Sequence, residues 1–236
     1  MSRFISSSLC PVRAKHERRK EARPGELIRA ALQLFVEKGF VATRSEEVAA
    51  RAGVSKGTLF LYFPSKTDLL KAVIAETLAG RYAEWNAEFA RFEGTTADML
   101  RHCLDVWWEL VGATPASGIA KLMMTEGNNF PELAAYYRRE VVEPGHALIR
   151  RILRRGVDSG EFAPVDVDHA SYAVVSTMAM LTLMRHSTIS CIDGTVAVDP
   201  RRYLSVQTDL LVGGLLAERP KIADSPRAPS ARKSTP

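Results

Sequence analysis

The stretch 52–70, AGVSKGTLFLYFPSKTDLL, constrains the fold of this chain more than any other segment does. A helix that starts at Ser55 has to end by Phe63, because Pro64 disfavours helical geometry at the residue before it. Gly53 supplies a turn conformation that a residue with a Cβ atom resists. We therefore expect a helix of about two turns, joined to an earlier helix by a tight turn.

Residues 45–63 have the pattern of a helix-turn-helix motif. Val48, Ala52 and Leu59 are expected to point inward, and Ala49 is small enough to let the two helices approach closely. The second helix presents free N–H groups and the positive end of its dipole at its front end, where Lys56 adds a charge for phosphate. Such a helix needs only its front end and one face in a major groove, so the motif predicts DNA binding.

Helical periodicity continues almost throughout the chain, and no run of short alternating segments separated by hairpin turns occurs. The sequence therefore predicts an all-α fold. Pro24 suits the first turn of the first helix, and Pro144 is expected to kink or split a long one. The expected helices cover residues 24–39, 45–53, 55–63, 65–92, 96–112, 116–126, 131–159, 166–190 and 200–217.

Charge is unevenly distributed along the chain, whose net charge is +5. Residues 1–23 hold seven Lys and Arg against two acidic residues, and residues 219–236 hold five against one. Residues 77–218 are acidic, with 13 basic against 18 acidic residues. A basic arm beside a folded module is typical of a nucleic-acid partner, although a solubilising tail has the same composition. Both ends are expected to be disordered. The expected domains are a basic arm (1–22), a helix-turn-helix domain (23–70), a larger helical domain (71–218) and a basic tail (219–236).

Three widely spaced cysteines, Cys10, Cys103 and Cys191, indicate neither a disulfide framework nor a metal site. The cluster of His102, Cys103 and Asp105 lacks ligand spacing on one helix face, so we expect no metal and no cofactor. The N-terminal stretch does not resemble a signal peptide, and no apolar run is long enough to span a bilayer. We therefore expect a cytoplasmic protein without a membrane partner.

The stretch 24–74 resembles the DNA-binding domain of the TetR family of transcriptional regulators. The matching residues are GELIRAALQLFVEKGFVATRSEEVAARAGVSKGTLFLYFPSKTDLLKAVI. The all-helical length of the rest is also that of the family. The resemblance implies a three-helix DNA-binding domain joined to a larger helical domain for ligand binding and dimerisation. It also implies a homodimer in which each subunit places its short third helix in a major groove of a palindromic operator.

Carried over position by position, the resemblance implies a set of DNA contacts at the second, third and fourth helices. Phe60 stands where the family commonly has Tyr, and Leu61 replaces a residue that is often polar, so readout at Leu61 is expected to be apolar. The alternative is that one of these two side chains only packs on the domain. The expected contacts are Thr43, Arg44, Ser55, Lys56, Gly57, Thr58, Phe60, Leu61, Tyr62 and Lys66.

The rest of the chain carries no enzyme signature such as HExxH, GxSxG, a P-loop or GxGxxG, so we expect no catalysis. In the family this part holds a small-molecule pocket. Aromatic and Met side chains provide adaptable apolar walls, although such side chains are as often ordinary core. We expect an apolar or aromatic effector, with Trp107, Met123, Tyr137 and Met178 as the candidate contacts.

The last two helices, within 166–217, are apolar nearly all round and therefore need burial on two sides. The family resemblance implies that they pair with a second copy in a four-helix bundle; a monomeric core is the alternative. The implied function is a sequence-specific repressor whose effector releases it from DNA. A helical enzyme and a non-specific binder acting through its basic tails remain as other classes. The sequence names neither the operator nor the effector. It does not distinguish a repressor from an activator, and it does not show whether the basic arm contacts DNA.

Overall fold

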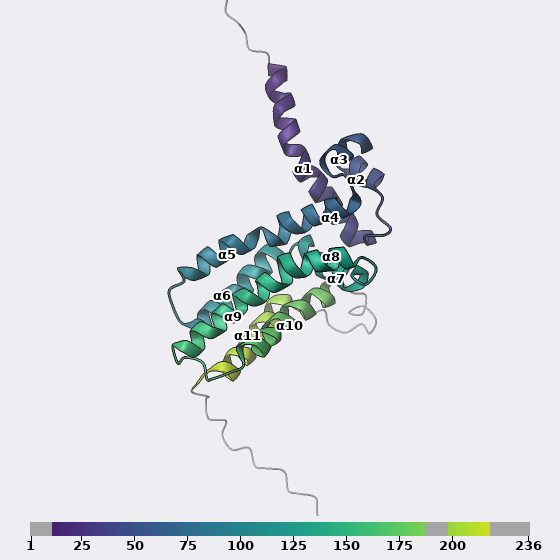
Figure 1. Ribbon diagram of the computed structural model, residues 1–236. Coiled ribbons are helices and arrows are strands. Elements are labelled where there is room, and N and C mark those ends of the chain that lie inside the picture. Colours follow the sequence, from purple (N-terminus) through teal and green to yellow (C-terminus); the bar gives the residue numbers. More distant parts are fainter. Residues whose placement is uncertain (1–10, 187–197, 218–236) are drawn as a thin grey trace, which may run out of the picture.

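The computed structural model of the protein describes residues 11–186 and 198–217, and for 11–23 it describes the backbone alone. Every element in these ranges is a helix, apart from one isolated antiparallel bridge between Phe162 and Leu216. The predicted all-α fold is confirmed. Figure 1 shows a small group of helices, α1 to α3, above a larger body of longer helices.

The small group consists of α1 (Pro11–Lys38), α2 (Ser45–Arg51) and α3 (Lys56–Tyr62), completed by the start of α4 (Lys66–Ile74). Leu27 and Phe35 of α1 are fully buried, and so are Val48 of α2 and Leu59 of α3. Apolar residues of α1 recur at the helical period, so one face of this helix supplies the centre of the group. The inward positions that the sequence predicts for Val48 and Leu59 are confirmed.

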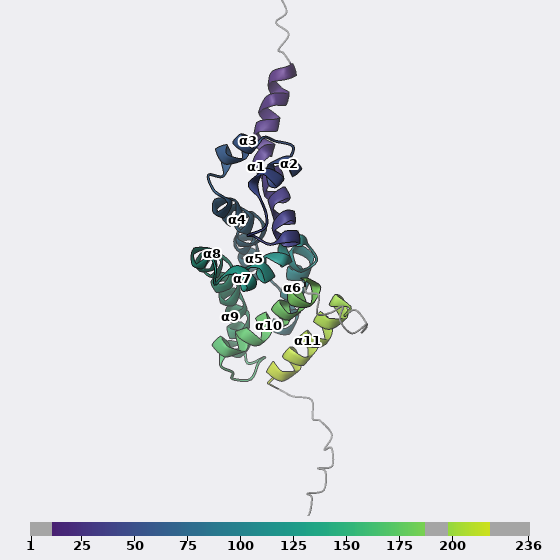
Figure 2. The same cartoon turned by 90° about the vertical axis from the view of Figure 1, so that its right-hand side faces the viewer.

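The first helix begins earlier than expected. The sequence suggests a start at Pro24 after a disordered arm, whereas α1 begins at Pro11 and contains Pro24 in its interior. The residues before Pro24 include KHERRKEA, in which Lys, Arg, Glu and Ala are strong helix formers. Their propensity outweighs the loss of one hydrogen bond at the proline, which has no N–H. Figures 1 and 2 show this part of α1 projecting from the rest of the molecule.

The expected tail over 219–236 and the first ten residues lie outside the described residues.

Three long helices of the body each contain a π-helical segment, in which the backbone makes i→i+5 hydrogen bonds. The helix that starts as α4 passes through η1 (Ala75–Ala79) into α5 (Arg81–Ala90), and α6 (Thr96–Trp107) passes into η2 (Trp108–Gly112). The third runs from α8 (Pro131–Tyr137) through η4 (Arg138–Val142) into α9 (Glu143–Asp158). The sequence predicts these three long helices but not their π segments.

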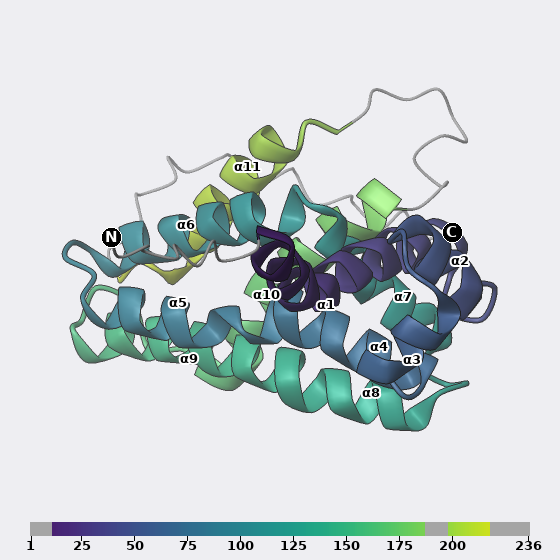
Figure 3. The ribbon, with the colours of Figure 1, turned by 90° about the horizontal axis from the view of Figure 1, so that it is seen from above.

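Pro144 lies in the first turn of α9, directly after the π segment η4. The long helix therefore continues through this proline. Pro144 has no N–H to donate to the helix, and the π segment η4 lies directly before it. Figure 3 shows α5 beside α9 and α4 beside α8, so that two of the long helices run together along the body.

The remaining helices are η3 (Pro115–Ser117, a 3₁₀ turn), α7 (Gly118–Glu126), α10 (Val167–His186) and α11 (Pro200–Leu215). The loop between α9 and α10 joins three helices. Phe162 is fully buried over Gly156 of α9, where a Cβ atom would lie 2.2 Å from the ring. The same loop pairs with the end of α11, because the N–H of Ala163 donates to the carbonyl of Leu215.

Glu161 of this loop also holds the start of α6. Its carboxylate accepts hydrogen bonds from the backbone N–H groups of Thr96 (2.6 Å) and Ala97 (2.8 Å). Burial alone would raise the pKa of Glu161, but these backbone hydrogen bonds outweigh it and lower the pKa. A carboxylate at a helix N-terminus is favourable, so the loop fixes both the start of α6 and the end of α11.

Candidate DNA-binding surface and effector cavity

The turn between α2 and α3 has the geometry that the sequence predicts. Gly53 has a φ of +68°, in the left-handed region that favours glycine. The N–H of Val54 donates to the carbonyl of Ala49 and closes the turn. Helix α3 ends at Tyr62 and is followed by Phe63, whose extended backbone precedes Pro64. The result is a helix of seven residues whose front end is held at the surface.

The front end of α3 is capped by Ser55, whose Oγ accepts the backbone N–H of Thr58 at 3.1 Å and lies 2.9 Å from the Thr58 hydroxyl. Lys56 and Gly57 are exposed at this end. The Lys56 ammonium pairs with Glu46 of α2 at 2.5 Å, and this hydrogen bond lowers the pKa of Glu46. Because the pair is exposed and weak, a DNA phosphate can replace the carboxylate as the partner of Lys56.

The outer face of α3 carries two exposed apolar side chains. Leu61 is 77% exposed and Phe60 is 37% exposed. Tyr62 is half-buried and packs against the core, so it lies on the inner edge of the same face. The exposure of Leu61 and Phe60 leaves both accessible to a groove, which is what an apolar readout of a thymine methyl group requires.

Arg44 is exposed and is the residue that precedes α2, where its N–H donates to the carboxylate of Glu47 at 3.3 Å. It therefore remains available for a DNA contact. Thr43 does not. Its side chain is 1% exposed, and its hydroxyl lies 2.7 Å from the carbonyl oxygen of Gly39 and 3.1 Å from that of Leu34. The predicted contact of Thr43 with the DNA backbone would not use this hydroxyl, because it closes the loop between α1 and α2.

Lys66 also has a different role from the predicted phosphate clamp. Its ammonium donates to the carbonyls of Phe40 (2.7 Å), Thr43 (3.0 Å) and Val41 (3.2 Å), and it lies 4.6 Å from the centre of the Phe40 ring. Burial lowers the pKa of Lys66, and the nearby carboxylate of Glu126 opposes this shift. With its three donors directed at backbone carbonyls, Lys66 fastens α4 to the loop between α1 and α2.

The body contains a cavity of about 160 Å³ among α5, α6, α7, α9 and α10. Each of the three π segments contributes to its wall, through Leu78 of η1, Val111 of η2 and Val141 of η4. Among the described residues, no Lys, Arg, Asp or Glu side chain lines it. The lining residues are Leu78, Tyr82, Trp85, Phe89, Cys103, Val106, Trp107, Val111, Ala116, Ser117, Ala120, Tyr137, Val141, Val142, Gly145, His146, Leu148, Ile149, Val175, Met178, Ala179 and Thr182.

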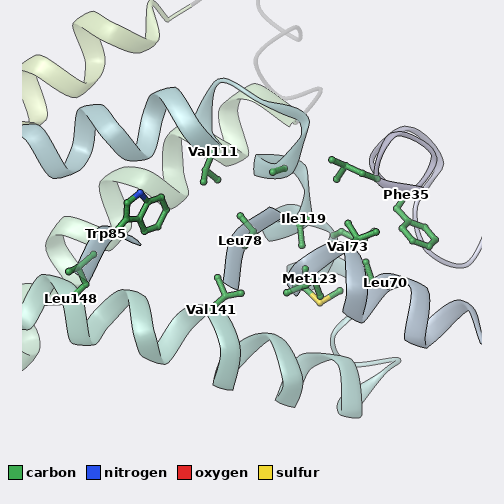
Figure 4. Packing of buried hydrophobic residues seen from close by; sticks show 14 of the residues in the cluster. Phe35, Leu70, Val73, Leu78, Trp85, Val111, Ile119, Met123, Val141 and Leu148 are labelled. Atoms are coloured by element: carbon green, nitrogen blue, oxygen red, sulfur yellow. The ribbon is translucent and has the colours of Figure 1, made fainter. Parts of the chain in front are cut away.

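Three of the four residues that the sequence suggests for an effector line this cavity: Trp107, Tyr137 and Met178. Met123 does not. It is buried in the core on the side toward the helix-turn-helix, and Figure 4 shows it near Leu70, away from Trp85. Met123 therefore lies outside this cavity, because α7 directs its side chain toward α4.

The helix that includes η1 and α5 carries a largely aromatic face that was not predicted from the sequence. Leu78, Tyr82, Trp85 and Phe89 follow one another at spacings of four, three and four residues, and all four line the cavity. This spacing places them on one helix face, so the signal was present in the sequence. The spacing alone does not distinguish a face that packs in the core from a face that lines a cavity.

The polar side chains of the cavity wall are neutral. The Tyr82 hydroxyl donates to the carbonyl of Val141 at 2.8 Å, and burial raises the pKa of Tyr82. Burial raises the pKa of Cys103 and of Tyr137 to about 12 each, so the thiol and the phenol are protonated at neutral pH. An effector in this cavity therefore meets an uncharged surface with few hydrogen-bonding groups.

His146 lies in the cavity wall and is buried. Its Nδ1 lies 3.0 Å from the Ser171 hydroxyl, which itself donates to the carbonyl of Asp168 at 2.7 Å. Because that hydroxyl has one proton, Nδ1–H is the donor toward Ser171. Burial, with the charge of Arg150, lowers the pKa of His146 and favours the neutral ring.

His102 pairs with the carboxylate of Glu88 at 2.6 Å. Within residues 11–186 and 198–217, no group of three or more His, Cys, Asp and Glu side chains is arranged to hold a metal ion. Over the same residues, the structure contains no helix that combines the length and the apolar character needed to cross a bilayer.

Helices α10 and α11 expose apolar side chains on the outside of the body. Tyr172 and Met180 of α10 are 60% and 48% exposed, and Val206 and Leu210 of α11 are 50% and 67% exposed. Within each helix these residues recur at intervals of four or eight, which places them on one face. A Cβ atom added at Gly213 or Gly214 would meet no other atom within 4 Å, so the end of α11 is open as well.

Comparison with known proteins agrees with this arrangement. Residues 27–73 match the family described as bacterial regulatory proteins, tetR family, and residues 93–199 match the tetracyclin repressor-like C-terminal domain. The HTH-type transcriptional regulator RutR of Escherichia coli K12 is 30% identical over 166 residues, which cover 68% of this chain and 74% of RutR.

Solved structures have the same fold. The fatty acid degradation regulator FadR from Bacillus halodurans superposes with a TM-score of 0.66 at 23% identity, covering 81% of this chain and 95% of FadR. FadR from Bacillus subtilis, solved in complex with stearoyl-CoA, superposes with a TM-score of 0.58 at 20% identity, covering 80% of this chain and 97% of that FadR chain.

RutR and the Bacillus subtilis protein YfiR are both HTH-type transcriptional regulators. An exposed, capped recognition helix, an apolar cavity in a helical body and these matches lead to one assignment: the chain belongs to the TetR family of transcriptional regulators.

Proposed function

We propose that this protein is a repressor that binds a palindromic operator as a homodimer and leaves it when a small molecule occupies the cavity. The observation that carries the proposal is the exposed front end of α3, where the Ser55 cap leaves Lys56 and Gly57 at the surface. Acting on bacterial DNA, it would work in the cytoplasm.

The proposed DNA surface combines the start of α2 with the front end and outer face of α3. Lys56 supplies a charge for phosphate, Gly57 permits close approach of the backbone, and Leu61 offers an apolar contact. Thr43 and Lys66 support this surface from beneath instead of contacting DNA. The proposed contacts are Arg44, Ser55, Lys56, Gly57, Thr58, Phe60, Leu61 and Tyr62.

The proposed dimer interface lies on α10 and α11, within residues 166–217. The exposed face that includes Met180 and Leu210 is apolar, and large apolar faces of this kind are typical of protein–protein interfaces. A twofold dimer would place the two α3 helices on successive turns of DNA, about 34–36 Å apart. In this division of the chain, residues 23–70 bind DNA and residues 71–218 bind effector and partner.

The proposed response to an effector depends on the helix that runs from α4 to α5. Its start is fastened to the DNA-binding helices through Lys66, and its continuation lines the cavity with Leu78 and Tyr82. An effector that prefers a different position of this helix would change the spacing of the two α3 helices. A preference of a few kcal/mol is enough to shift most of the population away from DNA.

The first test is selection of bound duplexes from a random DNA pool by the purified protein at near-physiological salt. The expected result is an enriched palindrome with half-sites one helical turn apart. Unenriched DNA with a steep dependence on salt would instead indicate phosphate binding through the basic tails.

A shortened protein without residues 1–23 separates these two outcomes. It is expected to keep the palindrome, since the recognition helix is intact. A full-length Lys56→Ala variant is the matched control and is expected to lose affinity. Retention of full operator affinity by Lys56→Ala would contradict the proposed surface.

A further inference from the structure

Trp85 carries a buried polar atom without a partner. Its side chain lines the cavity and the residue is 7% exposed. The indole Nε1 is sealed from solvent, and it has no hydrogen-bond acceptor among the residues that the structure describes. Buried N–H groups are almost always paired in folded proteins, because an unpaired donor keeps the full cost of its lost hydration.

Other polar groups of the cavity wall have their protons placed elsewhere. Tyr82 donates to the carbonyl of Val141, and Thr182 donates to that of Met178. The Ser117 hydroxyl lies 2.8 Å from the carbonyl of Thr114 and 2.7 Å from the ring of His186. None of these groups is an acceptor for the Trp85 indole, so an oxygen atom of a bound molecule can supply the acceptor that this donor lacks.

Tyr137 adds a second available donor. Its phenol is protonated, lines the cavity and makes no hydrogen bond with any other described residue. The indole N–H of Trp107 lines the same cavity and also has no hydrogen bond to another described residue. Within the part of the chain that the structure describes, the wall therefore has neutral donors and no charged side chain. A carboxylate or phosphate placed here would lose its hydration without gaining a counter-charge, which is far more costly than burying a neutral oxygen.

Figure 4 shows how the indole lies within the wall. Leu78, Val111, Val141 and Leu148 line the same cavity as the indole, whose nitrogen lies on the edge away from Leu148 in this view. The indole ring forms part of the cavity wall while its nitrogen is covered, so binding requires the indole to turn that edge toward the ligand. The cavity of about 160 Å³ is close in size to cavities that accept a benzene ring.

We infer that the effector of this protein is a small, neutral and mainly apolar molecule with a carbonyl or ether oxygen, and that Trp85 recognises this oxygen through its indole N–H. The inference rests on the proposed function only in calling the molecule an effector. It separates this chain from the Bacillus subtilis FadR structure, whose ligand is stearoyl-CoA, because a coenzyme A thioester is long and highly charged.

The test uses three probes of nearly the same shape with the full-length protein in the absence of DNA. Acetophenone carries the carbonyl oxygen, α-methylstyrene replaces that oxygen with a CH₂ group, and benzoate replaces the methyl ketone with a carboxylate. Stearoyl-CoA is the fourth probe. Binding is followed through the indole N–H signals of the three tryptophans in ¹⁵N-labelled protein.

Acetophenone is expected to bind about tenfold more tightly than α-methylstyrene, the ratio that corresponds to one buried donor gaining an acceptor. The Trp85 indole signal is expected to move to lower field with acetophenone and to keep its position with α-methylstyrene. Benzoate and stearoyl-CoA are expected to bind more weakly than acetophenone.

Trp85→Phe keeps an aromatic ring and removes the donor, so the ratio between acetophenone and α-methylstyrene is expected to fall to about one. This ratio is insensitive to the extra space that the smaller ring leaves, because both probes gain it. Trp108→Phe is the matched control: Trp108 lies outside the cavity wall, and the ratio is expected to stay near ten. Thermal melting establishes that each variant is folded.

Equal affinity for acetophenone and α-methylstyrene, tighter binding of benzoate or stearoyl-CoA, or no binding of acetophenone up to its solubility would each overturn the inference. Operator binding is measured separately. If acetophenone binds with the expected preference and operator affinity does not change, the recognition by Trp85 stands and the proposed release mechanism fails. If another compound releases the operator while acetophenone does not bind, the release mechanism stands and the inference fails.

Discussion

The ammonium group of Lys66 donates a hydrogen bond of 2.7 Å to the backbone carbonyl of Phe40 and lies over the ring of the same residue. Phe40 in turn packs edge-on against Phe130, with ring centres 4.8 Å apart. Phe130 directly precedes α8 in the body. The start of α4, the end of α1 and the loop before α8 therefore meet at one point between the DNA-binding helices and the body.

This geometry predicts that Lys66→Met lowers stability. The variant loses hydrogen bonds from a charged donor to three carbonyls, and we expect a free energy of unfolding lower by about 1–3 kcal/mol in urea denaturation. Lys56→Met is the matched control and is expected to leave stability within about 0.5 kcal/mol, since its side chain is exposed. If Lys66→Met weakened operator binding without any loss of stability, Lys66 would be a phosphate contact after all.

Lys56→Ala is expected to reduce the salt dependence of operator binding. Removing one phosphate contact lowers the slope of log Kobs against log salt by about one for each subunit. Fluorescence anisotropy with an operator duplex at several salt concentrations measures this slope. Glu46→Gln keeps the lysine and removes its partner in the free protein, so the slope is expected to be that of the natural protein. An unchanged slope in Lys56→Ala would exclude Lys56 from the phosphate contacts.

Leu210→Glu is expected to convert the proposed dimer to a monomer. The side chain is 67% exposed on α11, so a charge there costs the subunit itself little but would be buried in the proposed interface. Sedimentation velocity measures the change in mass, and operator affinity is expected to fall with it. Met124→Glu on α7, where the side chain is 58% exposed, is the control for a new surface charge and should remain dimeric. A dimeric Leu210→Glu protein would place the interface elsewhere.

Stability is expected to fall as pH decreases below about 6.5, the pKa of a histidine in an unfolded chain. Burial lowers the pKa of His146 and of His186, so the folded protein keeps these rings neutral while the unfolded chain binds protons. Acidification therefore lowers the free energy of unfolding, by at most about 1.4 kcal/mol per pH unit for each ring.

Urea denaturation between neutral pH and about pH 5 isolates this effect, because carboxylates with lowered pKa values such as Glu161 act below their ordinary value of 4.5. His146→Gln is expected to reduce the slope of the free energy of unfolding against pH by the contribution of His146. A slope equal to that of the natural protein would mean that His146 is already protonated in the folded state.

The sequence predicted those parts of the DNA-binding surface that depend on neighbouring residues. Gly53 has the expected left-handed conformation, Ser55 caps α3 as expected, and α3 ends before Pro64. Each of these features is decided within a few residues by turn, capping and proline chemistry. The short helix and its exposed front end could therefore be predicted without knowledge of the rest of the chain.

Residues whose role depends on distant partners could not be placed in this way. Lys66 reads as a phosphate ligand in sequence, yet its donors meet carbonyls more than twenty residues earlier. Met123 and Met178 are equally apolar, and only the packing of α7 and α10 directs one into core and the other to the cavity. The missing partner of the Trp85 indole is likewise a property of the whole assembly of helices.

The contact between Gly156 and Phe162 has a consequence for how this sequence can change. Any side chain at position 156 would occupy the place of the Phe162 ring, so neither residue can be exchanged for a larger one alone. A relative with alanine or a larger residue at 156 is therefore expected to carry a smaller residue at 162. The loop that contains Phe162 also pairs with the end of α11, which carries half of the proposed dimer interface. The absence of a side chain at Gly156 therefore also helps to hold this half of the interface on the body.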